Sequence, residues 1–223
     1  MILVEEIQHR VANEYAILAA GLSLRARGCT DPTRRFLAET SERLSDFAAV
    51  HRALTPPRSL IDVDLGEYLE TLCLALARAH LAERGLSLLL HPTSVAVEAH
   101  RAWKVGLIVS ELITNAVRHG SWNEGDGVIE VEISTGVSDV YCRVTDNGGA
   151  PKGWWPGRGT DIIAALAHDL GGSICREFNA CGATVLLNVP KLFEKGALPS
   201  VSQVCRAPDQ EARPAQGPRW PRR

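Results

Sequence analysis

The sequence lacks the features that would place the chain in a membrane or on nucleic acid. No apolar run in its 223 residues reaches the length that a membrane-spanning helix needs, and the first residues are acidic rather than like a signal peptide. The formal net charge is −2, whereas a general nucleic-acid binder is usually basic. We therefore expect a cytoplasmic protein that engages neither a membrane nor nucleic acid.

Cysteine pairs with the spacing of a metal site are also missing. The chain has six cysteines, none of them arranged as Cys-x-x-Cys, and most lie in apolar segments. We expect reduced thiols, and neither a disulfide framework nor a zinc site. An apolar content of 45% with 22% charged residues is typical of a globular protein.

Two amphipathic helices are expected first. Apolar residues recur at steps of three and four from Val4 to Leu22, and Gly28 ends this helix. Asp31-Pro32 predicts the N-cap and first residue of a second helix, which Pro56-Pro57 stops. A short connection makes the pair an antiparallel hairpin. Because two helices cannot enclose a core, we expect residues 1–58 to pair with a second copy as a four-helix bundle.

A different pattern follows the hairpin. Asp64 and Glu67 resemble a capping box and predict a helix that ends near Gly85. The further expected elements are a strand over 86–90, a helix from about 99 that ends at 120, strands over 128–133 and 140–145, a helix over 160–170, and strands over 173–178 and 183–189. We therefore predict an α+β fold, with an α/β sandwich of a mixed sheet and helices on one face over residues 59–193. Residues 194–223 are expected to be a flexible tail.

Three polar residues share one strip of the helix that ends at Gly120. Glu111, Asn115 and His119 are spaced i, i+4 and i+8. A carboxylate, an amide and an imidazole in a row can hold a hydrated metal, position a phosphate or move a proton. Downstream, Asp146-Asn147-Gly148-Gly149 precedes Gly157-Arg158-Gly159-Thr160, which opens another helix and suits a phosphate. Together these motifs predict a site for Mg-ATP.

A histidine of the first helix lies off its apolar face. On a helical wheel, Ile7 and Val11 cluster roughly opposite His9, which predicts that His9 points away from the hairpin's apolar seam. Asn13 follows one turn later on the same face. An exposed imidazole beside an ATP site can accept a phosphoryl group, and an ordinary surface histidine is the alternative.

These motifs resemble those of bacterial sensor histidine kinases, in particular the HWE class and its relatives with a histidine-arginine phosphoacceptor box. His9-Arg10-Val11-x-Asn13 is similar to that box, and residues 42–54 also look like this class. Counterparts of the N box, the two glycine boxes and the threonine box follow in the same order, at 111–119, 146–148, 157–159 and 182–184. The resemblance covers residues 1 to about 190.

The resemblance implies a dimerisation and phosphotransfer hairpin followed by a Bergerat-type ATP-binding domain. It implies that Asn115 binds Mg²⁺, that Asp146 accepts a hydrogen bond from the adenine amino group, and that Thr184 supports Asp146 or its bridging water. The other residues expected at the nucleotide are His119, Gly148, Gly157, Gly159 and Thr160.

The resulting hypothesis is an ATP-dependent protein-histidine kinase of two-component signalling. It autophosphorylates His9 and transfers the phosphoryl group to an aspartate in the receiver domain of a response regulator. Arg10 leaves His9 without a following carboxylate, so Glu111 is the expected general base. Asn13 is expected to orient a water for the reverse dephosphorylation. Because only eight residues precede His9, a separate sensor protein is an expected partner, beside a second copy in a homodimer.

Two alternatives stay open. Ala150 follows Gly149 where the family has a glycine, and only eight residues separate Gly148 from Gly157. These departures favour a histidine phosphotransfer protein whose ATP domain is degenerate and non-catalytic. A serine kinase of the anti-sigma-factor type shares the ATP fold, although the hairpin that carries His9 argues against it.

Overall fold

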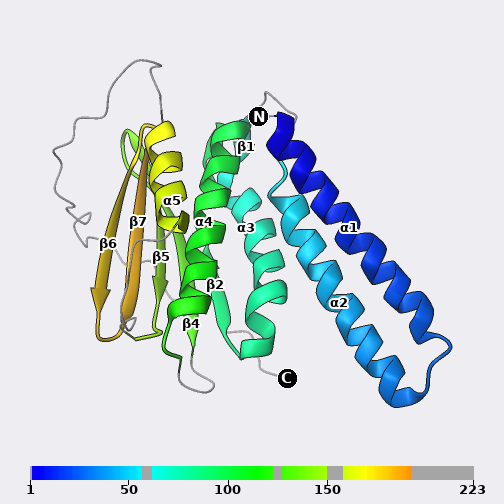
Figure 1. The fold of residues 1–223 in the computed structure, drawn as a ribbon. Coiled ribbons are helices and arrows are strands. Elements are labelled where there is room, and N and C mark those ends of the chain that lie inside the picture. Colours follow the sequence, from blue (N-terminus) through cyan, green and yellow to red (C-terminus); the bar gives the residue numbers. More distant parts are fainter. Residues whose placement is uncertain (1, 57–61, 123–126, 150–157, 192–223) are drawn as a thin grey trace.

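The computed structural model describes residues 2–56, 62–122, 127–149 and 158–191. A long helical hairpin leans against a layer of helices, and that layer covers one face of a sheet (Figure 1). The hairpin consists of α1, Ile2–Ala26, and α2, Asp31–Ala53. The helix layer consists of α3, Leu65–Leu76, α4, Ala99–His119, and α5, Arg158–Asp169. This arrangement confirms the predicted fold class.

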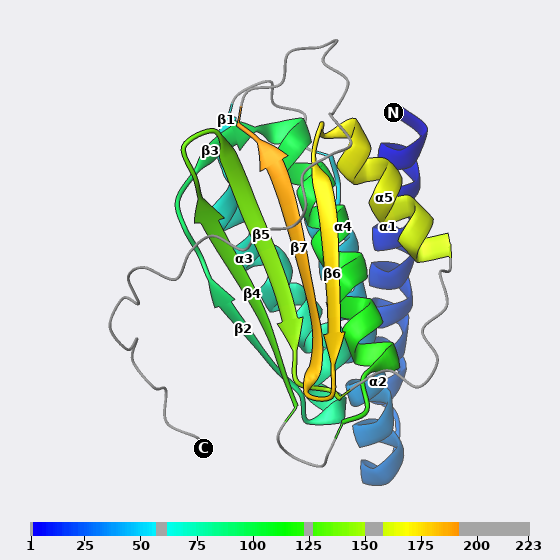
Figure 2. The same cartoon turned by 90° about the vertical axis from the view of Figure 1, so that its left-hand side faces the viewer.

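The five-stranded sheet is mixed, as predicted, and has the order β2-β4-β5-β7-β6. Its first two strands are parallel and all other neighbours are antiparallel. In chain order the strands are β2, Ser87–His91, β4, Val128–Thr135, β5, Asp139–Asp146, β6, Ser173–Asn179, and β7, Gly182–Pro190. Figure 2 looks onto the open face of this sheet, with the helices behind it.

Alternation along the strands decides which side chains face the helices. In β5, Val140, Cys142 and Val144 are buried, whereas Tyr141 and Arg143 are only partly covered. Because successive strand residues point to opposite faces, the first set packs beneath the helices and the second lies on the open face. The predicted strands therefore place their apolar residues in one core.

The helix that follows the hairpin starts and ends at the predicted residues. The Asp64 carboxylate accepts a hydrogen bond from the Glu67 backbone N–H at 3.1 Å, which confirms the cap. The helix continues through the π-helical turn η1, Ala77–Leu81, and the short η2, Ala82–Arg84, before Gly85 ends it with φ of +65°. A two-stranded sheet was missed, because β1, Asp62–Asp64, and β3, Ala96–Glu98, have three residues each.

Small residues form the contact between the two hairpin helices. Ala12, Ala19 and Ala26, spaced by seven, are buried against α2. In contrast, the apolar residues Ile7 and Leu18 remain 50% and 56% exposed. The second copy that we expect to cover such residues stays a prediction. One detail was wrong, because Thr30 rather than Asp31 precedes the first helical residue of α2.

The hairpin is tied to the helix layer at its carboxyl end. The Tyr68 hydroxyl donates to the Ala53 carbonyl at 3.1 Å, and the Trp103 indole N–H donates to the Leu54 carbonyl at 2.8 Å. Helix α2 therefore ends on two hydrogen bonds from α3 and α4, both made by side chains with a large apolar body.

An aromatic cluster joins α1, α2 and η1 farther along the hairpin. Tyr15 stacks on His51 with ring centroids 5.6 Å apart, and Phe47 lies 5.4 Å from His80. Burial lowers the pKa of both histidines, so their imidazoles favour the neutral form. His51 is thus a packed residue of the hairpin.

Within the described ranges, no helix has both the length and the apolar character that crossing a membrane requires. Four of the described cysteines are free thiols, as expected: Cys29, Cys73, Cys142 and Cys181. The expectation fails at Cys175, which takes part in a disulfide.

Candidate active site

A pocket opens between α4, α5 and the adjoining ends of β5, β6 and β7. It encloses about 650 Å³, including the part that is open to solvent. Its polar and glycine lining is Asn115, His119, Gly120, Asp146, Gly149, Thr160 and Arg176, and its apolar lining includes Leu112, Ile163 and Val185. An apolar cavity with a few convergent polar groups is typical of a small-molecule site.

The polar strip of α4 forms one wall of this pocket. The Asn115 side-chain N–H donates to the Glu111 carboxylate at 3.3 Å, so the two residues act as a pair. His119 lines the pocket one turn later and is exposed. The predicted i, i+4, i+8 alignment is therefore real, and the buried residues Ile113 and Val117 mark the opposite side of α4.

Asp146 lies at the end of β5 and is half-buried. Burial raises the pKa of its carboxyl group, while hydrogen bonds from the backbone N–H groups of Gly148 and Ala183 lower the pKa. The Gly148 N–H lies 2.9 Å from one carboxylate oxygen. These two donors fix the direction of the carboxylate, whose remaining lone pairs can accept from a ligand in the pocket.

Gly182 allows the start of β7 to lie against Asp146. Its φ is +147°, and a Cβ atom on it would lie 1.9 Å from the Asp146 carbonyl oxygen. Any side chain at this position would therefore push the two strands apart next to the pocket.

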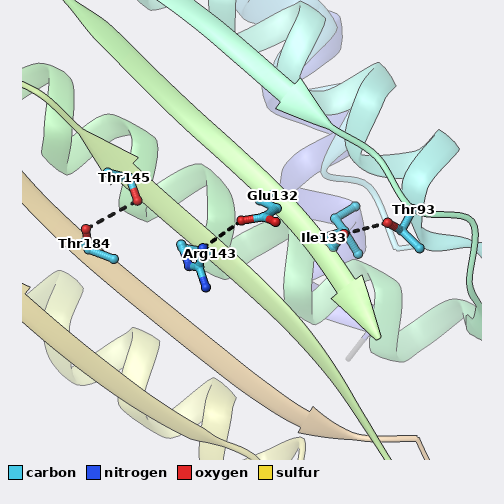
Figure 3. Close-up of polar contacts among 6 residues, drawn as sticks. All are labelled: Thr93, Glu132, Ile133, Arg143, Thr145 and Thr184. Atoms are coloured by element: carbon cyan, nitrogen blue, oxygen red, sulfur yellow. Dashed lines mark hydrogen bonds and ion pairs between the residues drawn. The ribbon is translucent and has the colours of Figure 1, made fainter. Parts of the chain in front are cut away.

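Thr184 forms no hydrogen bond with Asp146 in the described part of the chain, which corrects the expected direct support; support through a bridging water stays a prediction. The Thr184 hydroxyl lies 3.4 Å from that of Thr145, and both residues share a face of the sheet with Arg143 and Glu132 (Figure 3). The neighbour of Thr184 along β7, Ala183, lines the pocket instead. The threonine of the sequence motif thus lies one residue beyond the position that lines the pocket. Successive residues of a strand point to opposite faces, so Thr184 lies on the other face of the sheet.

The N-terminus of α5 lies directly against Glu111. A Cβ atom on Gly159 would lie 2.1 Å from a Glu111 carboxylate oxygen, and Thr160 lines the pocket beside it. The structure thus brings the second glycine motif to the polar strip of α4. Gly157, also predicted to approach the phosphates, and Ala150 fall outside the described residues.

The predicted phosphoacceptor His9 is exposed on α1, and Asn13 is exposed one turn later. Arg10 forms an ion pair with Glu6 at 2.7 Å, and the His51 imidazole shares a 2.6 Å hydrogen bond with the Gln8 amide. Figure 1 shows α1 beyond α2, on the side that faces away from α5 and the sheet. The structure therefore does not bring His9 to the pocket.

Sequence reasoning missed Arg176 among the residues that line the pocket. Arg176 belongs to no recognisable sequence motif. Only the pairing register of its strand could have indicated that it faces the pocket. Arg176 pairs with Val185 of β7, a core residue, so it must face the helices as well.

Comparisons with known proteins agree with this geometry. A family model described as "Histidine kinase" matches residues 6–80, and one described as "Histidine kinase-like ATPase domain" matches residues 74–185. The chain belongs to the histidine kinase family. The second match spans the whole pocket, from the strip of α4 to Val185.

Two relatives of this family show how much of a kinase the chain represents. It is 30% identical over 197 residues to Blue-light-activated histidine kinase 1 of Erythrobacter litoralis, covering 83% of this chain and 52% of the relative. It is 30% identical over 200 residues to the Sensor histidine kinase PdtaS of Mycobacterium tuberculosis, covering 84% of this chain and 39% of the relative. The chain therefore spans about half of the first relative and less of the second.

A solved structure of the family shares the fold. The histidine kinase domain of the Erythrobacter litoralis EL346 blue-light-activated histidine kinase superposes with a TM-score of 0.56 at 20% identity. The match covers 80% of this chain and 96% of that domain. The order of hairpin, helix layer and sheet is thus shared with a solved histidine kinase domain.

The contact between Gly159 and Glu111 yields a prediction. In Gly159→Ala the new methyl group displaces the Glu111 carboxylate and breaks its 3.3 Å hydrogen bond with Asn115. We expect Mg-ATP to bind about tenfold more weakly in calorimetry, since a hydrogen bond to a charged group is worth about 1.5–3 kcal/mol. The melting temperature should change little, because the displaced group is the end of a flexible side chain.

Gly21→Ala is the matched control, because a Cβ atom there meets no atom within 4 Å. It should leave ATP affinity unchanged. Equal ATP affinities for Gly159→Ala and the unmodified protein would show that the Glu111–Asn115 pair does not shape the site.

Proposed function

We propose that this chain is an ATP-dependent protein-histidine kinase that autophosphorylates His9 and passes the phosphoryl group to an aspartate of a response regulator. One observation carries the proposal. A single chain of the histidine kinase family combines an exposed histidine on a helical hairpin with a pocket that holds Asp146, Asn115 and Thr160. The division into a phosphotransfer hairpin over 1–58 and an ATP-binding domain over 59–193 belongs to the same proposal.

The two ends of the pocket suit the two ends of ATP. The fixed Asp146 carboxylate can accept a hydrogen bond from the adenine amino group. The N-terminus of α5 at Gly159 and Thr160 supplies backbone N–H groups and a positive dipole end, which suit phosphates. His119 also lines the pocket, where a ring N–H group can donate to a ligand.

The residues at the phosphate end fit Mg²⁺. Asn115 donates its amide N–H to Glu111, which leaves its amide oxygen for a ligand, and Glu111 adds a carboxylate. Carboxylate and amide oxygens are suitable ligands for this hard cation. The bound ion would neutralise charge on the phosphates, and Asn115 would hold it with Glu111 beside it.

The transfer itself needs a nucleophile and a base. A ring nitrogen of His9 attacks the γ-phosphorus of ATP, the bond to the β–γ bridging oxygen breaks, and ADP leaves. The proton on the other ring nitrogen then passes to the Glu111 carboxylate, which acts as general base. Reaction rate depends mainly on positioning and electrostatics, which the α4 strip and the α5 terminus supply.

His9 must approach the pocket for this reaction. In the described conformation α1 lies beyond α2, away from α5 (Figure 1). The proposal therefore includes either a movement of the ATP-binding domain relative to the hairpin or the use of a pocket in a second copy. Hydrogen bonds from Tyr68 and Trp103 to the end of α2 are the contacts that such a movement would strain or break.

A second function is favoured by one observation. Ala183, without a hydroxyl group, lines the pocket beside Asp146, while Thr184 points to the other face. A pocket with one polar side chain fewer for adenine favours a histidine phosphotransfer protein whose ATP domain is non-catalytic. In that case His9 would receive its phosphoryl group from another protein.

The first test is the chemistry of the label and its loss in His9→Ala. The unmodified protein, incubated with γ-labelled ATP and Mg²⁺, should gain an acid-labile, base-stable label. In His9→Ala we expect at least about a 100-fold loss of label, since the nucleophile is gone. ATP affinity in calorimetry should stay within about twofold, since His9 lies outside the pocket. His91→Ala, an exposed histidine on β2, serves as the control and should be labelled normally.

Each other outcome has a distinct meaning. Label that persists in His9→Ala would overturn the assignment of His9. An acid-stable label would favour the serine kinase alternative. A protein that gains no label from ATP, but whose His9 accepts a phosphoryl group from another phosphorylated protein, would favour the phosphotransfer alternative.

A further prediction concerns Asn13 and the reverse reaction. Asn13 is exposed one turn after His9, so a regulator docked at His9 would also contact it. Its amide can orient a water for attack on the phosphoaspartate. Asn13→Ala should therefore slow regulator dephosphorylation, measured without ATP, by about tenfold while His9 labelling continues. Glu14→Ala, exposed at the next position, is the control; equal dephosphorylation by all three proteins would leave Asn13 with a structural role only.

A further inference from the structure

Arg176 faces the interior of the molecule from the edge strand β6. The inward residues of this strand, Ile174, Arg176 and Phe178, pair with Leu187, Val185 and Ala183 of β7. A long cationic side chain therefore occupies a row otherwise filled by apolar residues. Helix α5 contacts β6, and Figure 2 shows the two side by side. Thr160 of α5 and Arg176 of β6 line the same pocket.

One nitrogen of the Arg176 guanidinium group lacks a hydrogen-bond partner. Its Nη2 atom is buried and forms no hydrogen bond, and no ion pair to Arg176 occurs in the described part of the chain. Burial lowers its pKa, but a guanidinium remains charged in proteins. A buried N–H group without an acceptor is unfavourable, and an anion is the acceptor that a guanidinium binds best.

The surroundings indicate what that counter-charge is. Arg176 lines the same pocket as Asn115, Asp146 and Thr160. Asp146 is already held by two backbone N–H groups and accepts from the adenine end in the proposed function. The triphosphate is the part of ATP that carries negative charge, and the planar fork of an arginine matches phosphate oxygens.

We propose that Arg176 binds a phosphate oxygen of the nucleotide from the sheet side of the pocket. This inference rests on the proposed function and adds a positioning residue to it. Arg176 would face the phosphates from β6, while the N-terminus of α5 donates from the other side. The phosphate chain would then lie between a strand and a helix terminus.

The experiment compares two ligands that differ only in phosphates. Arg176→Met keeps a long unbranched side chain and removes the charge, and calorimetry measures ATP and adenosine binding. We expect ATP affinity to fall by roughly 10- to 100-fold and adenosine affinity to stay within about twofold. Arg176→Lys keeps the charge but not the planar fork. Its ATP affinity should therefore lie between that of Arg176→Met and that of the unmodified protein.

Arg143→Met is the matched control. Arg143 belongs to the same sheet but to its open face, where it pairs with Glu132 at 2.9 Å (Figure 3). This variant should bind both ligands as the unmodified protein does. Melting temperatures check that every variant is folded. If Arg176→Met does not fold, the comparison of ATP with adenosine is made with Arg176→Lys.

Three results would overturn the inference, and they are distinguishable. Unchanged ATP affinity in Arg176→Met would show that Arg176 touches no phosphate. Equal losses for ATP and adenosine would assign it to the base or to the shape of the pocket. An unmodified protein that binds neither ligand would overturn the proposed kinase function, and the phosphate contact with it.

Discussion

The structure of the candidate site depends on how Asp146 is held. Its carboxylate ends a central strand, is half-buried, and accepts hydrogen bonds from the Gly148 and Ala183 backbone N–H groups. Those donors exist because the chain turns sharply after β5 and because Gly182 lets β7 start against the Asp146 carbonyl. A carboxylate is thus held in the lining of a mostly apolar pocket. There it favours a ligand that donates a hydrogen bond to it.

The rest of the pocket is built by helix packing onto the same sheet. The buried side of α4 rests on the core, which turns Glu111 and Asn115 to the pocket, and α5 approaches so closely that a Cβ atom at position 159 would displace the Glu111 carboxylate. Near the other end of α5, Lys104 of α4 forms an ion pair with Asp169. The pocket is therefore built by packed elements, whereas the hairpin holds His9 elsewhere. In the proposed function, His9 reaches a pocket only if these two parts move relative to one another or if a second copy supplies the pocket.

Most elements were predictable because their signals are local. The strip at Glu111, Asn115 and His119 follows from helical spacing, and the strands follow from alternation between turns. Three features were not predictable. β1 and β3 are too short to show a period, the face of Thr184 depends on a one-residue register, and Arg176 reaches the pocket only through strand pairing. Each of these depends on contacts between distant segments, which spacing along the chain does not contain.

The most direct test of the account is nucleotide selectivity at Asp146. Adenine presents an amino group where guanine presents a carbonyl oxygen, and a carboxylate accepts from the first and repels the second. Calorimetry with Mg²⁺ should therefore show one ATP site per chain with GTP bound at least about tenfold more weakly. In Asp146→Asn, whose amide both donates and accepts, the preference should disappear. Equal binding of ATP and GTP by the unmodified protein, or binding of neither, would contradict the account.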